Sequence, residues 1–125
     1  MAGNIAVGIA LVSALAADEM PAPPQGDMTG SWQVSIVGGP NPICKFTQND
    51  KFFGGSCEGP AAAGVAFGTI DAVSVRWSYQ WTGKSDGAVG AFEFIGKMSG
   101  PGLISGTMLM TTGPGTFKFT AQRAE

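Results

Sequence analysis

The residues of this chain that could bind a ligand are mostly aromatic or sulfur-containing. Six of them are expected to face inward. Tyr79, Trp81, Met108 and Met110 lie toward the ends of predicted strands, and Phe92 and Phe117 lie nearby by register. A lining of aromatic rings and methionines suits a flat or apolar small molecule. The same side chains could instead simply fill a hydrophobic core, and the sequence leaves both interpretations open.

Side chains for acid–base catalysis or metal binding are scarce. The 125 residues include no histidine, which removes the commonest general base and metal ligand. The nine carboxylates fall in turns, tails or outward positions, so no acid–base pair converges. Two cysteines without histidine cannot fill a structural zinc shell, and the sequence contains neither a G-x-S-x-G elbow nor a phosphate loop. We therefore predict no catalytic residue, no metal and no cofactor.

The elements that must position these side chains are strands. From residue 29 onward, apolar and polar residues alternate, most clearly in VSVRWSYQW at 73–81, and no segment has a comparable helical period. The expected strands span 31–37, 43–48, 51–58, 65–71, 73–81, 88–98, 102–111 and 115–122. Their links are too short for crossovers. We therefore predict an all-β fold, an eight-stranded antiparallel up-and-down β-barrel with no significant helix after the N-terminal segment.

The N-terminal part of the chain differs in composition from the rest. Residues 1–17 hold an apolar run that is shorter than the roughly 20 residues of a membrane span and ends near a small-x-small site. We interpret them as a signal peptide, or alternatively as a retained apolar segment. Residues 18–28 form a Pro-rich linker, and 29–125 the barrel domain. The expected location is secreted or periplasmic, in a bacterium, with no membrane span.

The charge of the chain excludes one class of partner. Charged residues make up 13% of the sequence and the net charge is −2. No cluster of lysine and arginine forms a basic stripe. We therefore expect no nucleic-acid partner.

The first predicted hairpin positions the two cysteines. A tight turn centred on Asp50 and Lys51 places Cys44 directly opposite Cys57, and both share the inward parity. Cysteines opposed on adjacent antiparallel strands come within reach of a disulfide, and export would supply the oxidising compartment. We therefore predict a Cys44–Cys57 disulfide, with two free buried thiols as the alternative.

A second hairpin follows from the sequence WTGKSDG. Centring its turn on residues 84–85 places Arg76 opposite Glu93 on the outside and Trp77 opposite Phe92 on the inside. We interpret the charged pair as ordinary surface electrostatics rather than as a site.

The first and last strands carry a structural pair. Gly30 and Trp32 head the first strand as G-x-W in GSWQVSI, and Arg123 ends the last in FTAQR. In a closed barrel these strands are neighbours, so the guanidinium can lie across the indole. We assign Trp32 and Arg123 a structural role in closing the fold.

These stretches resemble the calycins, lipocalins and avidins in particular. Members of those families begin their first strand with G-x-W, and in lipocalins a basic residue late in the barrel packs on that tryptophan. The chain also resembles small exported bacterial domains that contain strands like FFGGSCEG. The resemblance implies an eight-stranded barrel. The lipocalin C-terminal helix and the avidin biotin-binding residues are not recognisable, so neither is carried over.

Three functions remain open from the sequence. The first is an exported, non-catalytic barrel that binds a small apolar or aromatic ligand. The second is a structural or interaction subunit, in a homo-oligomer or another extracellular or envelope assembly. The third is a barrel cyclase or isomerase of the allene-oxide-cyclase or dirigent style, in which an apolar cavity steers a reactive intermediate.

Overall fold

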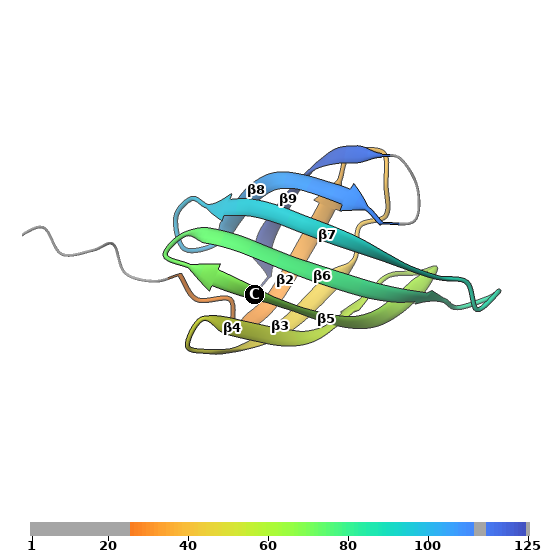
Figure 1. Cartoon of the computed structure of the whole chain (residues 1–125), viewed down its shortest axis with the longest axis horizontal. Coiled ribbons are helices and arrows are strands. Elements are labelled where there is room, and N and C mark those ends of the chain that lie inside the picture. The colour runs from red at the N-terminus through yellow and green to blue at the C-terminus, as the bar shows by residue number, and fades with distance from the viewer. Residues whose placement is uncertain (1–25, 112–114, 125) are drawn as a thin grey trace, which may run out of the picture.

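The computed structural model describes residues 26–111 and 115–124, and these residues form a β-barrel (Figure 1). The strands are β2 (Gly30–Ile36), β3 (Ile43–Asn49), β4 (Phe52–Glu58), β5 (Ala62–Asp71), β6 (Ser74–Gly83), β7 (Val89–Met98), β8 (Leu103–Met110) and β9 (Thr116–Ala124). Each strand pairs antiparallel with the next, and β9 pairs with β2 to close the barrel. The predicted all-β, eight-stranded up-and-down barrel is confirmed, and the described part of the chain contains no helix.

The barrel has two ends of different character. The connections β3–β4, β5–β6 and β7–β8 lie at one end, on the left of Figure 1, which we call the closed end. The connections β2–β3, β4–β5 and β6–β7 lie at the opposite, open end. This division matters for function because the pocket described below lies at the open end.

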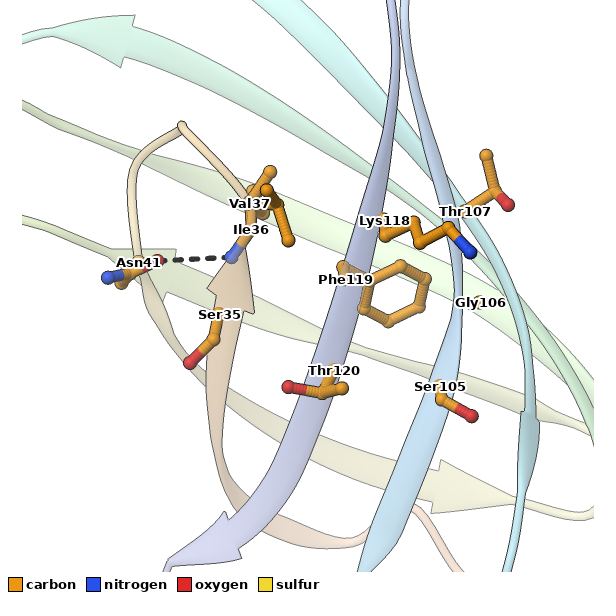
Figure 2. A pocket seen from close by; sticks show the side chains of 10 residues that line it. All are labelled: Ser35, Ile36, Val37, Asn41, Ser105, Gly106, Thr107, Lys118, Phe119 and Thr120. Carbon is orange, nitrogen blue, oxygen red and sulfur yellow. Dashed lines mark hydrogen bonds between the residues drawn. The ribbon is translucent and has the colours of Figure 1, made fainter.

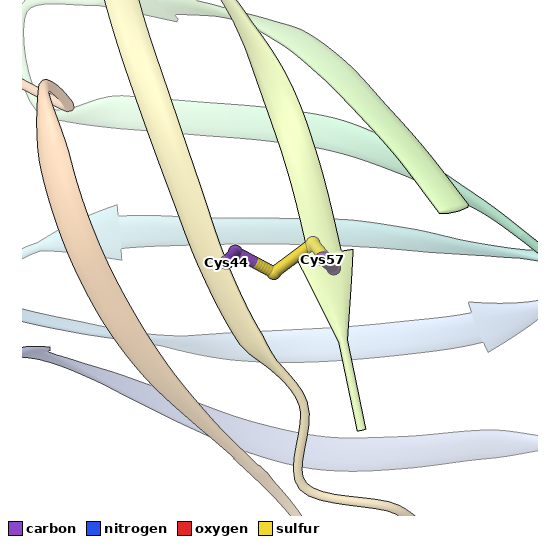
Figure 3. The surroundings of a disulfide bond; sticks show 2 residues. All are labelled: Cys44 and Cys57. Carbon is purple, nitrogen blue, oxygen red and sulfur yellow. A yellow bond between two sulfur atoms is a disulfide. The ribbon is translucent and has the colours of Figure 1, made fainter. Parts of the chain in front are cut away.

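The β3–β4 hairpin has the register expected from the sequence. Asn49 pairs with Phe52 across a two-residue turn, in which Asp50 has a φ of 62°. Cys44 therefore lies opposite Cys57. Their sulfur atoms are bonded, with 4.0 Å between the Cα atoms, and the bridge joins β3 to β4 near the open end (Figure 3). The predicted disulfide is confirmed.

The β6–β7 hairpin has a different register from the one expected. Arg76 lies opposite Ile95, and Trp77 opposite Phe94, so the pairing is shifted by two residues. The cause is the turn. The strands end at Gly83 and Val89, and Gly83 N donates to Ala88 O at 2.6 Å, which leaves a longer loop than a turn centred on 84–85. The predicted Arg76–Glu93 and Trp77–Phe92 pairs are therefore wrong.

The closed end is sealed by Trp32 and Arg123, as the sequence predicted. The guanidinium lies 4.5 Å from the centre of the fully buried indole. It also donates to the backbone carbonyls of Asp27, Thr29 and Pro101. Gly30 supplies the space for this contact: its φ is 126°, and a Cβ there would lie 3.1 Å from the guanidinium. The G-x-W motif thus fixes the arginine as well as the tryptophan.

Residues assigned by sequence to the linker complete this seal. Met28 is fully buried, and its carbonyl accepts a hydrogen bond from Trp32 Nε1 at 2.9 Å. Gln48 binds the segment from the other side, because its side chain accepts from Met28 N and donates to Gly26 O. Met28 lay outside the predicted barrel, and although Gln48 belonged to a predicted strand, nothing in the sequence pattern indicated that its side chain binds Gly26 and Met28.

The middle of the barrel is filled by an aromatic core. Trp77 stacks on Phe94, with 4.6 Å between the ring centres, and makes edge contacts with Phe46, Phe53 and Phe119. These rings are almost fully buried. The core therefore leaves no passage from one end of the barrel to the other, and a ligand can reach the interior only at the mouth.

Strand β5 begins three residues earlier than expected. Its first inward positions carry the small residues Ala62, Gly64 and Ala66. The start of the strand therefore lacks the alternation of large apolar and polar residues by which a strand is recognised in a sequence. Gly64 allows the backbone of β6 to approach closely, since a Cβ there would lie 1.8 Å from Gln80 O.

Candidate functional site: a pocket at the open end

A pocket of about 320 Å³ opens between the loops of the open end. Its lining combines aromatic rings, prolines and small residues: Pro40, Asn41, Pro42, Gly59, Pro60, Ala61, Ala62, Tyr79, Trp81 and Phe92. The volume is near the lower limit for small-molecule sites, which span about 300–1,000 Å³. The pocket therefore suits a compact ligand.

Three aromatic rings form the base of the pocket. The ring centre of Phe92 lies 6.1 Å from that of Tyr79 and 5.9 Å from that of Trp81. Tyr79 and Trp81 share the inward face of β6, and Phe92 lies directly opposite Tyr79 on β7. The indole of Trp81 covers Gly90, where a Cβ would lie 2.4 Å from Cζ2. These contacts fix the rings before any ligand arrives.

The walls of the pocket are loops held by backbone hydrogen bonds. Pro42 O accepts from Val34 N at 2.9 Å, and Asn41 Oδ1 accepts from Ile36 N at 3.0 Å. On the other wall, Gly59 N donates to Ala62 O at 2.9 Å. Prolines stiffen both walls because the ring of proline fixes φ.

The disulfide links these two walls. Cys44 follows Pro42 by two residues, and Cys57 precedes Gly59 by two. The bridge therefore joins the roots of the loops that flank the pocket (Figure 3). A rigid, preformed site loses less conformational entropy when a ligand binds.

An ion pair lies at the rim of the pocket. Lys84 Nζ contacts Glu58 Oε2 at 2.9 Å, and Lys84 N donates to Ala61 O at 2.8 Å. The hydrogen bond and charge of Lys84 lower the pKa of Glu58. Both side chains are exposed, so the ion pair adds little stability. Together with the Lys84 N–Ala61 O hydrogen bond, it connects the β6–β7 loop to the pocket wall that contains Ala61.

Two polar groups of the lining have no partner among the described residues. Tyr79 is 3% exposed, and its hydroxyl makes no hydrogen bond there. Trp81 Nε1 is also buried without an acceptor in the described part of the chain. Burial, and secondly the charge of Glu58, raise the pKa of Tyr79. The Tyr79 hydroxyl is the group that a ligand atom can reach, because it is not among the fully buried unpaired atoms, whereas Trp81 Nε1 is.

The structure separates the six side chains that the sequence singled out. Tyr79, Trp81 and Phe92 line the pocket together. Met108 is 2% exposed and belongs to the core. Met110 and Phe117 are partly buried against that core, outside the pocket lining.

Sequence reasoning missed the pocket walls. Pro40, Pro42 and Pro60 lie in connections between strands, where proline is ordinary turn chemistry and signals no site. The sequence does not show that two such connections stand side by side over the same three rings.

A larger hollow of about 660 Å³ lies on the outside of the barrel, over β2, β9 and β8 (Figure 2). Outward side chains line it, among them Ser35 of β2, Thr120 and Lys118 of β9, and Ser105 of β8. We regard it as a consequence of the bend in the sheet, since none of these polar groups is buried.

The described residues contain no group of three histidine, cysteine or carboxylate side chains that could hold a metal ion. Nor does that part of the chain contain a helix long and apolar enough to cross a membrane. Comparison of the chain with protein-family models, with curated proteins and with solved structures finds no match.

Proposed function

We propose that this protein is an exported, non-catalytic barrel of the calycin type that binds a small apolar or aromatic ligand at its open end. The observation that carries the proposal is the pocket of about 320 Å³ over Tyr79, Trp81 and Phe92. Concave, mostly apolar sites with a few polar groups are the usual form of small-molecule sites.

The construction of the barrel supports this assignment. The closed end is sealed by Trp32 and Arg123, and the middle is filled by the rings around Trp77. Hydrogen bonds hold the loops that surround the mouth. A chain that needed only a stable core would gain apolar burial by filling the mouth as well.

Export is supported by the chemistry of the cysteines. Disulfides persist in oxidising compartments and are rare in the cytosol. The Cys44–Cys57 bridge fits that environment, as does the apolar run predicted as a signal in residues 1–17, which lies outside the described residues.

The proposal can be tested with a neutral fluorescent probe, N-phenyl-1-naphthylamine, and a matched pair of variants. Ala62 faces the pocket, whereas Ala63 is next to it in β5 and lies on the opposite face. We expect saturable binding to the native protein and to Ala63→Leu, and at least tenfold weaker binding to Ala62→Leu. Equal binding to both variants, or no binding to the native protein, would refute the proposal.

A second function, self-association, is favoured by the outer face of β4 and β5. Phe52 is 66% exposed and Phe67 50% exposed, and Val65 continues the same apolar face. Exposed aromatic patches of this kind commonly mark protein interfaces. The occupant we propose is a second copy of the chain, because the exposed side chains of Phe52, Val65 and Phe67 are uncharged and do not repel the same side chains of another copy. A native monomer at high concentration by light scattering, unchanged by Phe67→Ser, would exclude this.

The cyclase or isomerase alternative stays a prediction from the sequence. The pocket lining contains Tyr79 as its single titratable side chain. Such an activity would have to depend on the shape of the pocket and on that hydroxyl alone.

A further inference from the structure

Two polar side chains of the open-end pocket lining have groups that a ligand could meet. The indole Nε1 of Trp81 is not one of them, because it is buried without an acceptor among the described residues. Asn41 uses its Oδ1 to accept from Ile36 N, so the amide group that remains for a ligand is Nδ2. The Tyr79 hydroxyl can donate or accept and is unpaired in the described structure. An acceptor on the ligand can pair with both Asn41 Nδ2 and the Tyr79 hydroxyl.

The lining also disfavours a charged ligand. None of the side chains that line the pocket is charged. Lys84 and Glu58 form an ion pair at the rim, with 2.9 Å between Lys84 Nζ and Glu58 Oε2. Burying an ion in an apolar pocket without a counter-charge carries a large desolvation cost. A carboxylate or an ammonium group would therefore be rejected.

The rings and prolines select a flat shape. Phe92 and Trp81, tilted by 46° to each other, both line the pocket. Pro42 and Pro60 lie on the two walls. Aromatic side chains favour offset or edge contacts with another ring. A long aliphatic chain would have to fold up, because the core around Trp77 blocks its path into the barrel.

We propose that the pocket selects neutral, planar aromatic molecules that carry a carbonyl oxygen, which accepts a hydrogen bond from the Tyr79 hydroxyl. This inference rests on the proposed function and narrows it to one ligand class. Burial keeps the hydroxyl protonated, since it raises the pKa of Tyr79, so the donor is present throughout the neutral range.

The experiment compares four probes on the native full chain by isothermal titration calorimetry. Coumarin is neutral, planar and carries a carbonyl; naphthalene has a similar shape without an acceptor. Coumarin-3-carboxylate adds a negative charge, and 1-decanol is neutral and aliphatic. We expect coumarin to bind most tightly, naphthalene about five- to tenfold more weakly, and the other two more weakly still.

A single variant tests the named hydrogen bond. Tyr79→Phe keeps the ring and removes the donor. The affinity for coumarin should therefore fall by the same factor of roughly five to ten, while the affinity for naphthalene is unchanged. Phe117→Leu, outside the pocket lining, serves as the control. The wild-type ranking stands independently if the variant fails to fold.

The outcomes separate this inference from the proposed function. If decanol or the carboxylate binds as well as coumarin, the site is real but the proposed ligand class is wrong. If naphthalene binds as tightly as coumarin, or Tyr79→Phe weakens both equally, the hydrogen bond is refuted. If no probe binds and N-phenyl-1-naphthylamine fails as well, both proposals are overturned.

Discussion

Replacing Arg123 with alanine should destabilise the barrel far more than its partly exposed position indicates. The guanidinium stacks 4.5 Å from the centre of the Trp32 ring and donates to carbonyls of Asp27, Thr29 and Pro101. A cation–π contact contributes about 0.5–2 kcal/mol, and a typical hydrogen bond about 0.5–1.5 kcal/mol. Water can replace some of the lost hydrogen bonds, so we expect a total loss of about 2–3 kcal/mol.

The assay is urea denaturation together with thermal melting. For a domain of this size the loss corresponds to a fall in Tm on the order of 10–20 °C. Arg123→Lys keeps the charge but not the planar fork, so it should recover only part of the loss. Arg76→Ala removes an exposed arginine from the outer face of β6 and serves as the control, with an expected change within about 0.5 kcal/mol. If Arg123→Ala loses no more stability than Arg76→Ala, the closing role of Arg123 is refuted.

Three further predictions test other parts of the structure. Replacing Cys44 and Cys57 with alanine should cost about 3 kcal/mol in urea denaturation and weaken coumarin binding in calorimetry; unchanged affinity would show that the walls need no bridge. In Gly55→Ala the new Cβ would lie 1.8 Å from a carbonyl of β3, so the variant should lose more than about 2 kcal/mol in the free energy of unfolding. Gly54→Ala is the control, because its Cβ would make only ordinary contacts. Equal Tm values for the two variants would contradict this prediction. The pKa of Tyr79 is higher in the folded than in the unfolded chain, where it is about 10. The contribution of Tyr79 to the free energy of unfolding is therefore complete below the unfolded pKa and is lost as the pH rises through the folded pKa. In Tyr79→Phe, the free energy of unfolding should fall less steeply at alkaline pH.

The parts of the fold that followed from sequence are those fixed by local rules. Alternation along β6 determined which side chains face inward, because successive residues of a strand point to opposite faces. The two-residue turn at Asp50 fixed the register of β3 and β4, and with it the disulfide between Cys44 and Cys57. The pairing of Trp32 with Arg123 followed from closure, since closure makes the first and last strands neighbours.

The errors arose where the geometry depends on longer loops or on several segments at once. The loop between Gly83 and Val89 forms hydrogen bonds that extend it, so a turn centre read from composition displaced the register by two residues. Met28 was assigned to the linker because an isolated apolar residue has no periodicity.

The candidate site was predicted only in part for the same reason. Tyr79 and Trp81 share one strand face, and Phe92 lies on the neighbouring strand, so alternation was enough to bring them together. The prolines of the walls belong to separate connections that meet only in the folded barrel. Met110 and Phe117 share the inward parity but pack against the core, since parity does not show which inward side chains surround a pocket.

The most direct test of the central claim, that ligand enters at the open end, uses the three tryptophans of the chain as markers. Trp32 lies at the closed end, Trp77 in the filled core and Trp81 in the pocket. Each indole N–H gives a separate signal in a ¹⁵N-correlated NMR spectrum, assigned with single Trp→Phe variants. On titration with coumarin, the Trp81 signal should shift along a saturable curve while the Trp32 signal stays fixed. A shift of Trp32 without Trp81, or no shift of any indole at saturating coumarin, would contradict the account.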